Sequence, residues 1–200
     1  MRGASAYAKP AASKPEGELR IRRVALEETI VRAFFEANDY KTALGHCRQL
    51  ASMLPERPDA VRRLAFCQRE MKDVDGCLKT LADLKDPEPL VEEALFQSQG
   101  APDDRQKLLE ATVRSGVLRL LEPLAREDAG RRAALDAIRR LGRRILPALI
   151  AEMEEGPKSP GPVLEAGAII TGIPNDPAAT NGYKAKAAAW RAWLESTRAK

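Results

Sequence analysis

Residues 39–55, DYKTALGHCRQLASMLP, return 34 positions later in altered form as residues 73–89, DVDGCLKTLADLKDPEP. Both copies begin with an aspartate, carry a small residue at the fifth position and end with a proline. The matched positions are Asp39 and Asp73, Tyr40 and Val74, Ala43 and Cys77, Pro55 and Pro89, and, just upstream, Ile30-Val31 and Leu64-Ala65. A 34-residue period is typical of repeats in which each unit is a pair of helices that stacks on the next.

The hydrophobic spacing around these copies predicts four helices, over residues 19–37, 40–54, 58–72 and 74–84. In each of them apolar residues recur at the spacing of one helix face. The composition agrees with this, because hydrophobic residues make up 44% of the chain while aromatic residues make up only 4%. A core built mainly from Leu, Ala, Ile and Val suits close helix–helix packing. The chain is therefore predicted to be all-α.

These features resemble the tetratricopeptide repeat family over two units, residues 24–57 and 58–91. The first unit carries the family pattern in Asp39-Tyr40 at the turn, in Ala43 and in the closing Pro55. The resemblance implies a right-handed α-α superhelix, a solenoid of stacked helical hairpins that binds protein partners.

The sequence departs from the family pattern at two positions. Glu27 stands where the family has a tryptophan, and Gln68 stands where an aromatic residue is usual. Two units are also fewer than the three that such a stack usually needs for stability. We therefore expect the rest of the chain to cap the stack.

The second half continues as short helices without the 34-residue period. They are predicted over residues 90–99, 103–113, 117–126, 128–141 and 145–154, separated by Gly100-Ala101-Pro102, Ser115-Gly116, Gly142 and Gly156-Pro157. Residues 131–153 resemble a HEAT repeat, and the segments 168–172 and 190–193 are similar to the end of bacterial HEAT-like proteins. We expect a flexible N-terminal segment (1–18), tetratricopeptide-like repeats (19–91) and HEAT-like repeats with a C-terminal capping helix (92–200).

Trp190 and Trp193 lie three residues apart on the predicted last helix. We expect one or both to cap the open end of the core, since tryptophan is usually largely buried. An aromatic binding patch is the alternative.

The resemblance implies that the first helix of each unit lines a concave groove. The groove residues that follow by register are Glu28, Arg32, Phe35, Asp59, Arg62, Phe66 and Arg69. Arg62, Phe66 and Arg69 share one helix face, which suits a peptide with a carboxylate and an apolar anchor. The alternative is a solvated arginine face with Phe66 packed into the neighbouring helix. The Lys/Asn set with which some relatives hold a chaperone C-terminus is missing, which disfavours that partner.

Residues 131–144 form a predicted helix with a broad cationic face. Its arginines are Arg131, Arg132, Arg139, Arg140, Arg143 and Arg144. They lie opposite the apolar stripe of Ala134, Ile138, Leu141 and Ile145. Such a face can contact nucleic acid or an acidic partner. It can also be a solubilising face paired in part with Glu122, Glu127 and Asp128, because the net charge of the chain is only +4 and aromatic residues are not interleaved with the arginines.

No catalytic constellation stands out in the sequence. The single histidine, His46, is adjacent to Cys47, so the two side chains point to different sides of a helix and do not form a nucleophile–base pair. We predict no catalytic residue, no metal and no cofactor. Asn and Asp residues in the loop 173–182 could suggest Ca²⁺, but turn formation explains them more simply.

We therefore predict a non-catalytic scaffold or adaptor that binds a peptide or protein partner on its concave face. Nucleic acid or acidic-partner binding through residues 131–144 is one alternative, and a structural subunit of a larger assembly is another. No segment reaches the length of a membrane span, and three cysteines without paired spacing favour a reducing, cytoplasmic location. The segment around Met1 is either the natural start or the cut end of a longer protein.

Overall fold

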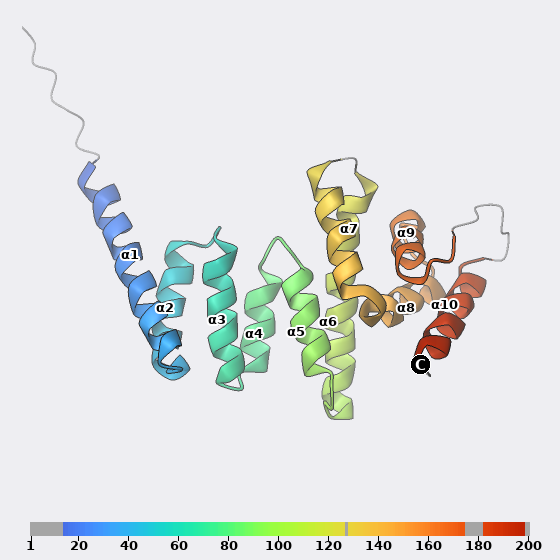
Figure 1. Cartoon of the computed structure of the whole chain (residues 1–200), viewed down its shortest axis with the longest axis horizontal. Helices are drawn as coiled ribbons and strands as arrows, with labels where there is room; N and C mark the ends of the chain where they lie inside the picture. Colours follow the sequence, from blue (N-terminus) through green and yellow to red (C-terminus); the bar gives the residue numbers. More distant parts are fainter. Residues whose placement is uncertain (1–13, 127, 175–181, 199–200) are drawn as a thin grey trace, which may run out of the picture. The chain divides into compact units, whose positions relative to one another are not determined.

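The computed structural model describes residues 14–126, 128–174 and 182–198. These residues form α-helices and short 3-10 helices, and no strand occurs among them. The chain divides into two compact units, one ending at Thr80 and one beginning at Leu81. The predicted all-α, helical-repeat fold is confirmed (Figure 1). The division by repeat type at residue 91 stays a prediction.

Unit 1 is built from consecutive antiparallel helices. They are α1 (Lys14–Glu36), α2 (Tyr40–Met53), α3 (Pro58–Glu70) and the start of α4 (Val74–Ala82). α2 packs against both α1 and α3. The core of the unit is buried and made of small and medium apolar side chains: Val31, Ala43, Cys47, Leu50, Ala60 and Cys67. Three of them, Ala43, Cys47 and Leu50, lie on α2 at the spacing of one helix face.

The turns after α1 and α3 repeat each other bond for bond. Asn38 and Lys72, which are 34 residues apart, are the non-glycine residues with positive φ in the described chain, at 55° and 65°. The next residue closes each helix, as Asp39 N donates to Phe34 O and Asp73 N donates to Gln68 O, both over 2.9 Å. This is the pattern of a Schellman motif. The 34-residue period is therefore present in the backbone.

The two aspartates that follow these turns cap the next helix. The side chain of Asp39 accepts a hydrogen bond from Thr42 N (3.1 Å), and that of Asp73 accepts one from Gly76 N (3.0 Å). A carboxylate in this place satisfies one of the free N–H groups at a helix start. The repeated aspartate is thus explained by the same local chemistry in both copies.

The second copy then departs from the first, and the expected equivalence of the two prolines is wrong. Pro55 lies outside the helices, between α2 and α3, whereas Pro89 lies in the first turn of α5 (Glu88–Gln97). Proline is tolerated in a first turn because the N–H that it lacks would have no helical partner there. α4 has already ended at Ala82, so Pro89 begins a helix instead of closing one.

Unit 2 continues with helices that pack in two alternating rows. They are α5, α6 (Asp103–Leu121), η1 (Glu122–Ala125), α7 (Ala129–Leu141), η2 (Gly142–Ile145), α8 (Leu146–Glu155), α9 (Pro160–Thr171) and α10 (Gly182–Arg198). α8 packs against α6 and α10, while α7 packs against α9. The fully buried side chains include Leu109, Ile138, Leu141, Leu149, Met153 and Trp190. This alternation is what stacked helical hairpins require.

The predicted break at Ser115-Gly116 does not occur, because α6 runs through it. Gly116 is buried, and a Cβ placed on it would lie 2.6 Å from Cγ2 of Val91 on α5. The glycine therefore lets α5 and α6 approach closely. Gly142 and Gly156, in contrast, end α7 and α8 with φ of 53° and 89°, as their predicted role as breaks requires.

Trp190 of α10 is fully buried, and Trp193 is partly exposed. The Trp190 ring lies directly over Gly167 of α9, where a Cβ would be 1.9 Å from its Cζ2 atom. One of the two tryptophans thus closes the core of unit 2, as predicted.

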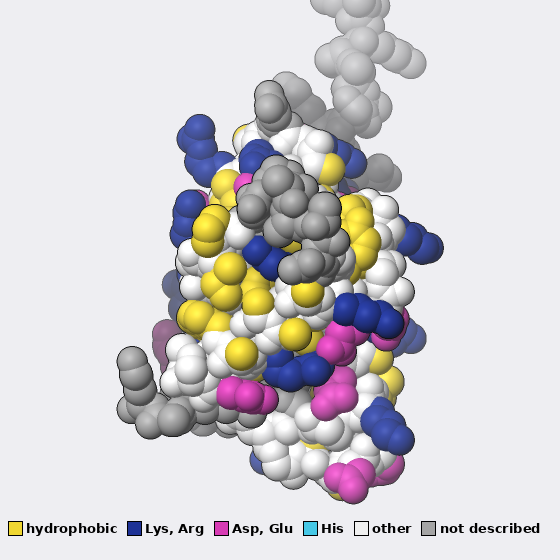
Figure 2. Space-filling model, turned by 90° about the vertical axis from the view of Figure 1, so that its right-hand side faces the viewer, with side chains coloured by type: hydrophobic (Ala, Val, Ile, Leu, Met, Phe, Trp, Pro, Cys, Tyr) yellow, Lys and Arg dark blue, Asp and Glu magenta, His cyan; other side chains and the backbone are white. Residues whose placement is uncertain are grey.

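Figure 2 views the molecule from the side where α10 lies and shows hydrophobic, basic and acidic side chains interleaved, without a continuous basic surface.

Candidate binding surfaces

Two of the predicted groove residues, Phe35 of α1 and Phe66 of α3, belong to one aromatic cluster. The rings of Phe35, Phe66 and Tyr40 lie 5.3 to 5.6 Å apart, centroid to centroid. All three side chains are half-buried. The guanidinium carbon of Arg69 lies 4.7 Å from the centre of the Phe66 ring, a cation–π contact. Phe66 therefore packs against the neighbouring helix, as the alternative interpretation expected, and also positions Arg69.

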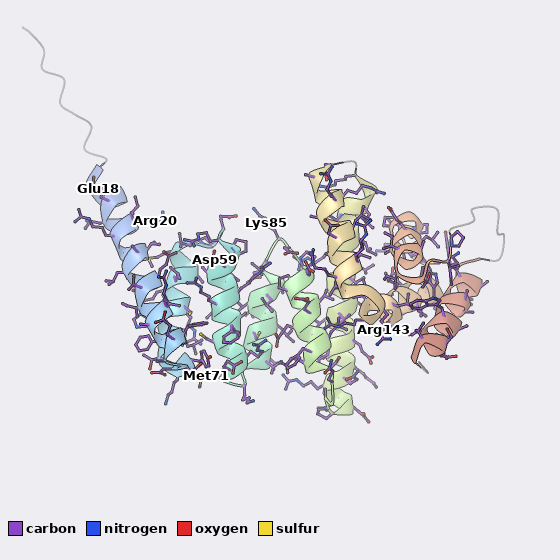
Figure 3. All side chains as sticks on the ribbon, viewed as in Figure 1. Glu18, Arg20, Asp59, Met71, Lys85 and Arg143 are labelled. Carbon is purple, nitrogen blue, oxygen red and sulfur yellow. The ribbon has the colours of Figure 1, made fainter. Side chains whose placement is uncertain are left out.

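The other groove residues meet at the start of α3 through a residue outside the predicted set. Arg57 donates to Glu28 of α1 over 2.7 Å and to Asp59 of α3 over 2.7 Å. The hydrogen bonds from Arg57 lower the pKa of Asp59 below its usual value. Asp59 lies at the first turn of α3 and Met71 just beyond its end (Figure 3). Arg57 neutralises both predicted carboxylates, and its place in the loop before α3 gave no signal in the sequence.

Arg32 and Arg62 complete the predicted set, and both are exposed. Arg62 lies one helical turn before Phe66, and Arg32 lies three residues before Phe35. The structure thus arranges the seven predicted residues as an aromatic cluster with Arg69, a bridged carboxylate pair, and two exposed arginines.

The Arg-rich helix is amphipathic as predicted. Ala134, Ile138, Leu141 and Ile145 are each at most 3% exposed. The α7 side chains Arg131, Arg139 and Arg140 form ion pairs: Arg131 with Glu165, Arg139 with Asp136 over 3.0 Å, and Arg140 with Glu88 over 2.6 Å.

Two of the three carboxylates that were expected to pair with these arginines do not do so. Asp128 instead caps α7 by accepting from Gly130 N and Arg131 N, and Glu122 forms no ion pair in the described part of the chain. Glu127 lies outside the described residues. The pairs that form join residues up to 52 positions apart, which the local sequence does not reveal.

Three of the six arginines in residues 131–144 form no ion pair in the described part of the chain. Arg132, Arg143 and Arg144 are exposed, and no ion pair involves them within the described ranges. Arg143 lies where η2 leads from α7 into α8 (Figure 3). The free positive charge of the helix is therefore about half of what the sequence suggested.

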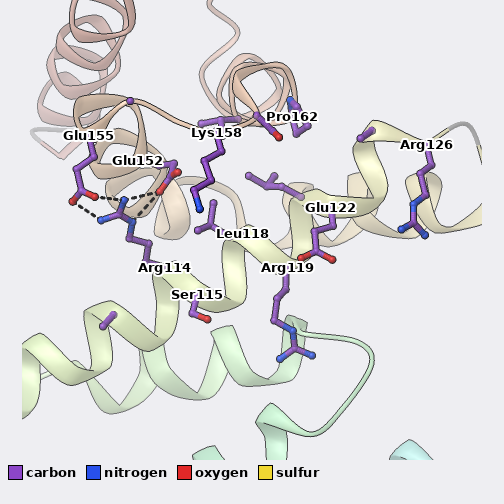
Figure 4. A pocket seen from close by; sticks show the side chains of 16 residues that line it. Arg114, Ser115, Leu118, Arg119, Glu122, Arg126, Glu152, Glu155, Lys158 and Pro162 are labelled. Carbon is purple, nitrogen blue, oxygen red and sulfur yellow. Dashed lines mark hydrogen bonds and ion pairs between the residues drawn. The ribbon is translucent and has the colours of Figure 1, made fainter.

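Unit 2 also holds a pocket that the sequence did not predict. It has a volume of about 990 Å³ and lies between α6, η1 and the segment from the end of α8 into α9. Apolar side chains such as Leu118, Leu121 and Val163 line it together with the cations Arg126 and Lys158. In Figure 4, Lys158 reaches toward Leu118. Glu122 also lines the pocket, so both signs of charge lie beside its apolar surface.

One wall of the pocket is held by a charged network. Arg114 of α6 donates to Glu152 over 2.6 Å and to Glu155 over 2.5 Å, both on α8 (Figure 4). Arg114 lowers the pKa of the Glu155 carboxyl below its usual value. The predicted break at Ser115-Gly116 hid this site, because the predicted helix 103–113 ended before Arg114 and Leu118 was placed on the next helix.

The histidine and the thiols form structural contacts. His46 Nδ1 lies 2.8 Å from Oε2 of the buried Glu27, and its ring stacks on Phe34. Cys47 and Cys67 are fully buried, with their sulfur atoms 3.7 Å apart. No group of three or more His, Cys, Asp or Glu side chains among the described residues is placed to hold a metal ion. Most of the Asn/Asp loop, residues 175–181, lies outside the described residues.

Residues 34–98 match the tetratricopeptide repeat family. This match covers the second part of unit 1, where the 34-residue period was found, and continues into α5. No curated protein and no solved structure matches the chain. Tetratricopeptide repeats generally mediate protein–protein interaction. Where the structure describes the chain, no helix combines the length and the hydrophobicity of a membrane span. The resemblance of the second half to HEAT repeats stays a prediction.

Proposed function

We propose that this protein is a non-catalytic interaction module that binds a peptide or protein segment across α1 and α3 of unit 1. The observation that carries the proposal is the half-buried cluster of Phe35, Phe66 and Tyr40, covered in part by Arg69. Aromatic and arginine side chains are the residues most often found at the centre of protein interfaces. The family match over residues 34–98 supports the same function.

The charge of this face specifies the partner. Glu28 and Asp59 contribute two negative charges, which Arg57 bridges. Arg32, Arg62 and Arg69 add three further guanidinium groups. Arg69 pairs with Glu70 over 3.4 Å, so with Arg57 the face carries four guanidinium groups against three carboxylates. The bound segment is therefore acidic, with an apolar side chain that packs on the exposed edge of Phe66 or Phe35. Its carboxylates pair with Arg62 and Arg32.

A charge-reversal experiment tests this proposal. The double variant Arg32→Glu, Arg62→Glu removes cations from the proposed face, and Arg48→Glu is a control because Arg48 is an exposed arginine of α2 in the same unit. Extract proteins bound to the immobilised chain are identified, and the affinity of a purified candidate is then measured. We expect the double variant to weaken binding at least about tenfold and the control to change it little. Equal binding by both variants would refute the proposed face.

A second candidate function is contact with a polyanion through Arg132, Arg143 and Arg144. The observation that favours it is their exposure without ion pairs in the described part of the chain. Affinity for a mixed DNA or RNA oligonucleotide should then fall steeply as the salt concentration rises. Charge reversal at these three positions should abolish it. If no binding occurs at low salt, this function is excluded.

A further inference from the structure

One flank of α1 presents an apolar stripe on which no helix packs within the described ranges of the chain. Leu19, Leu26 and Ala33 recur every seven residues, and Ile30 and Ala37 each follow four residues after a member of this series. Leu19 is 65% exposed and Leu26 is 59% exposed. In Figure 1, α1 lies at one edge of unit 1, with α2 on its other side. Exposed apolar side chains that line one helix face indicate an interaction surface.

The charges beside the stripe specify which partner fits. Arg22, Thr29 and Glu36 lie on one rim of the stripe, again seven residues apart, so that the cation and the carboxylate are equally far from Thr29. All three are exposed, and neither Arg22 nor Glu36 forms an ion pair among the described residues. If a second, antiparallel α1 is placed with Thr29 at the two-fold axis, each Arg22 faces the Glu36 of the other copy. A parallel pair would instead place like charges together.

We propose that the protein forms a two-fold symmetric dimer through α1, with the two α1 helices antiparallel and their leucine stripes in contact. This inference is independent of the proposed function. Glu28, Arg32 and Phe35 lie on a different side of α1, because 100° per residue separates them from the Leu19–Leu26–Ala33 stripe. The dimer would leave the proposed partner surface of each protomer free, so that one dimer would present two such surfaces.

The test is the mass of the full chain in solution, measured by sedimentation equilibrium over about 1–200 µM. We expect the mass to rise from 21.9 kDa toward twice that value. Leu26→Asp should raise the dimer Kd at least about 100-fold, because the charge enters the contact twice. Ile21→Asp is the matched control, since Ile21 is an exposed apolar residue of α1 outside the stripe, at 70% exposure compared with 59% for Leu26.

Charge exchange tests the antiparallel arrangement itself. Arg22→Glu and Glu36→Arg should each raise the Kd roughly tenfold, because each creates two like-charge contacts. The double variant restores opposite charges and should return the Kd to near that of the wild type. Helicity of every variant is checked by circular dichroism. A chain that stays monomeric overturns the proposal, as does an equal effect of Leu26→Asp and Ile21→Asp. A double variant as weak as the single ones overturns the antiparallel pairing.

Discussion

The close contact between α9 and α10 leaves no room for a side chain at Gly167. In Gly167→Ala, the new Cβ would lie 1.9 Å from Cζ2 and 2.3 Å from Cη2 of Trp190. Carbon atoms that are not bonded approach to about 3.5–4.0 Å, so the ring must move by more than an ångström. Trp190 is fully buried and has no free space to enter. The substitution should therefore destabilise unit 2, although alanine favours a helix more than glycine does.

The two opposing effects set the size of this loss. Overpacking a well-filled core costs about 1–3 kcal/mol. The change from glycine to alanine inside a helix returns about 1 kcal/mol at most. Because an approach of 1.9 Å is severe, the upper part of that range applies, about 2–3 kcal/mol, and the net loss in the free energy of unfolding is about 1–2 kcal/mol. Gly45→Ala is the matched control, since no atom lies within 4 Å of its Cβ position in α2, and it should stabilise unit 1 by about 0.5–1 kcal/mol.

Urea unfolding followed by tryptophan fluorescence measures this loss directly, because both tryptophans of the chain lie on α10. Trp190→Phe in the Gly167→Ala background should recover part of the stability, since the smaller ring removes the clash. It sacrifices no hydrogen bond of the indole, because Trp190 Nε1 has no partner in the described part of the protein. If Gly167→Ala is as stable as the wild type, the packing of α10 on α9 described above is wrong.

Three further predictions concern unit 1. Asp73→Ala removes the hydrogen bond to Gly76 N and should lower the stability of unit 1 by about 1 kcal/mol in urea unfolding. Hydrogen bonds from Thr42 lower the pKa of Asp39 below 3.8, so its stabilising effect should be complete above that pH and be lost as the pH falls through the lower folded value. This loss should be absent in Asp39→Asn. The free energies of unfolding of the wild type and the variant are compared at several acidic pH values. The cysteine thiols are at most 1% exposed and should react with a disulfide reagent only after unfolding.

Each of these results has a contrary outcome. An Asp73→Ala protein with unchanged stability would mean that the second turn does not depend on its cap. An Asp39 pKa at or above its usual value would show that the hydrogen bond from Thr42 N to its carboxylate does not form in solution. Fast reaction of all thiols in the native protein would show that the core of unit 1 opens readily.

The sequence was sufficient for features that depend on local chemistry. The aspartates at 39 and 73 cap helices because a short side chain at that position satisfies free N–H groups, whatever lies elsewhere in the fold. The buried faces of α2 and α7 follow from helical spacing alone. The 34-residue period recurs in the turns at Asn38 and Lys72, because each turn is specified within a few residues.

Features that depend on distant contacts were not predictable. The pair Ser115-Gly116 predicted the end of a helix. Instead Val91 of α5 packs on Gly116, and α6 continues through it. Arg140 pairs with Glu88 from 52 residues away, so the charge of the Arg-rich helix was overestimated. The pocket beside Arg114 was not predicted for the same reason, since its lining residues come from α6, α8 and α9 together. Sequence spacing gives the faces of helices but not which faces meet.

The most direct test of the central claim is site-specific photocrosslinking. A photoreactive amino acid is placed at Arg62, with Arg48 on α2 and Arg144 in η2 as comparison positions, all of which are exposed. The proposed function predicts that a protein partner is crosslinked from position 62 and not from position 48 or 144. A partner crosslinked from 144 alone would favour the Arg-rich helix instead. Equal crosslinking from 48 and 62 would contradict the assignment of the α1 and α3 face as the binding surface.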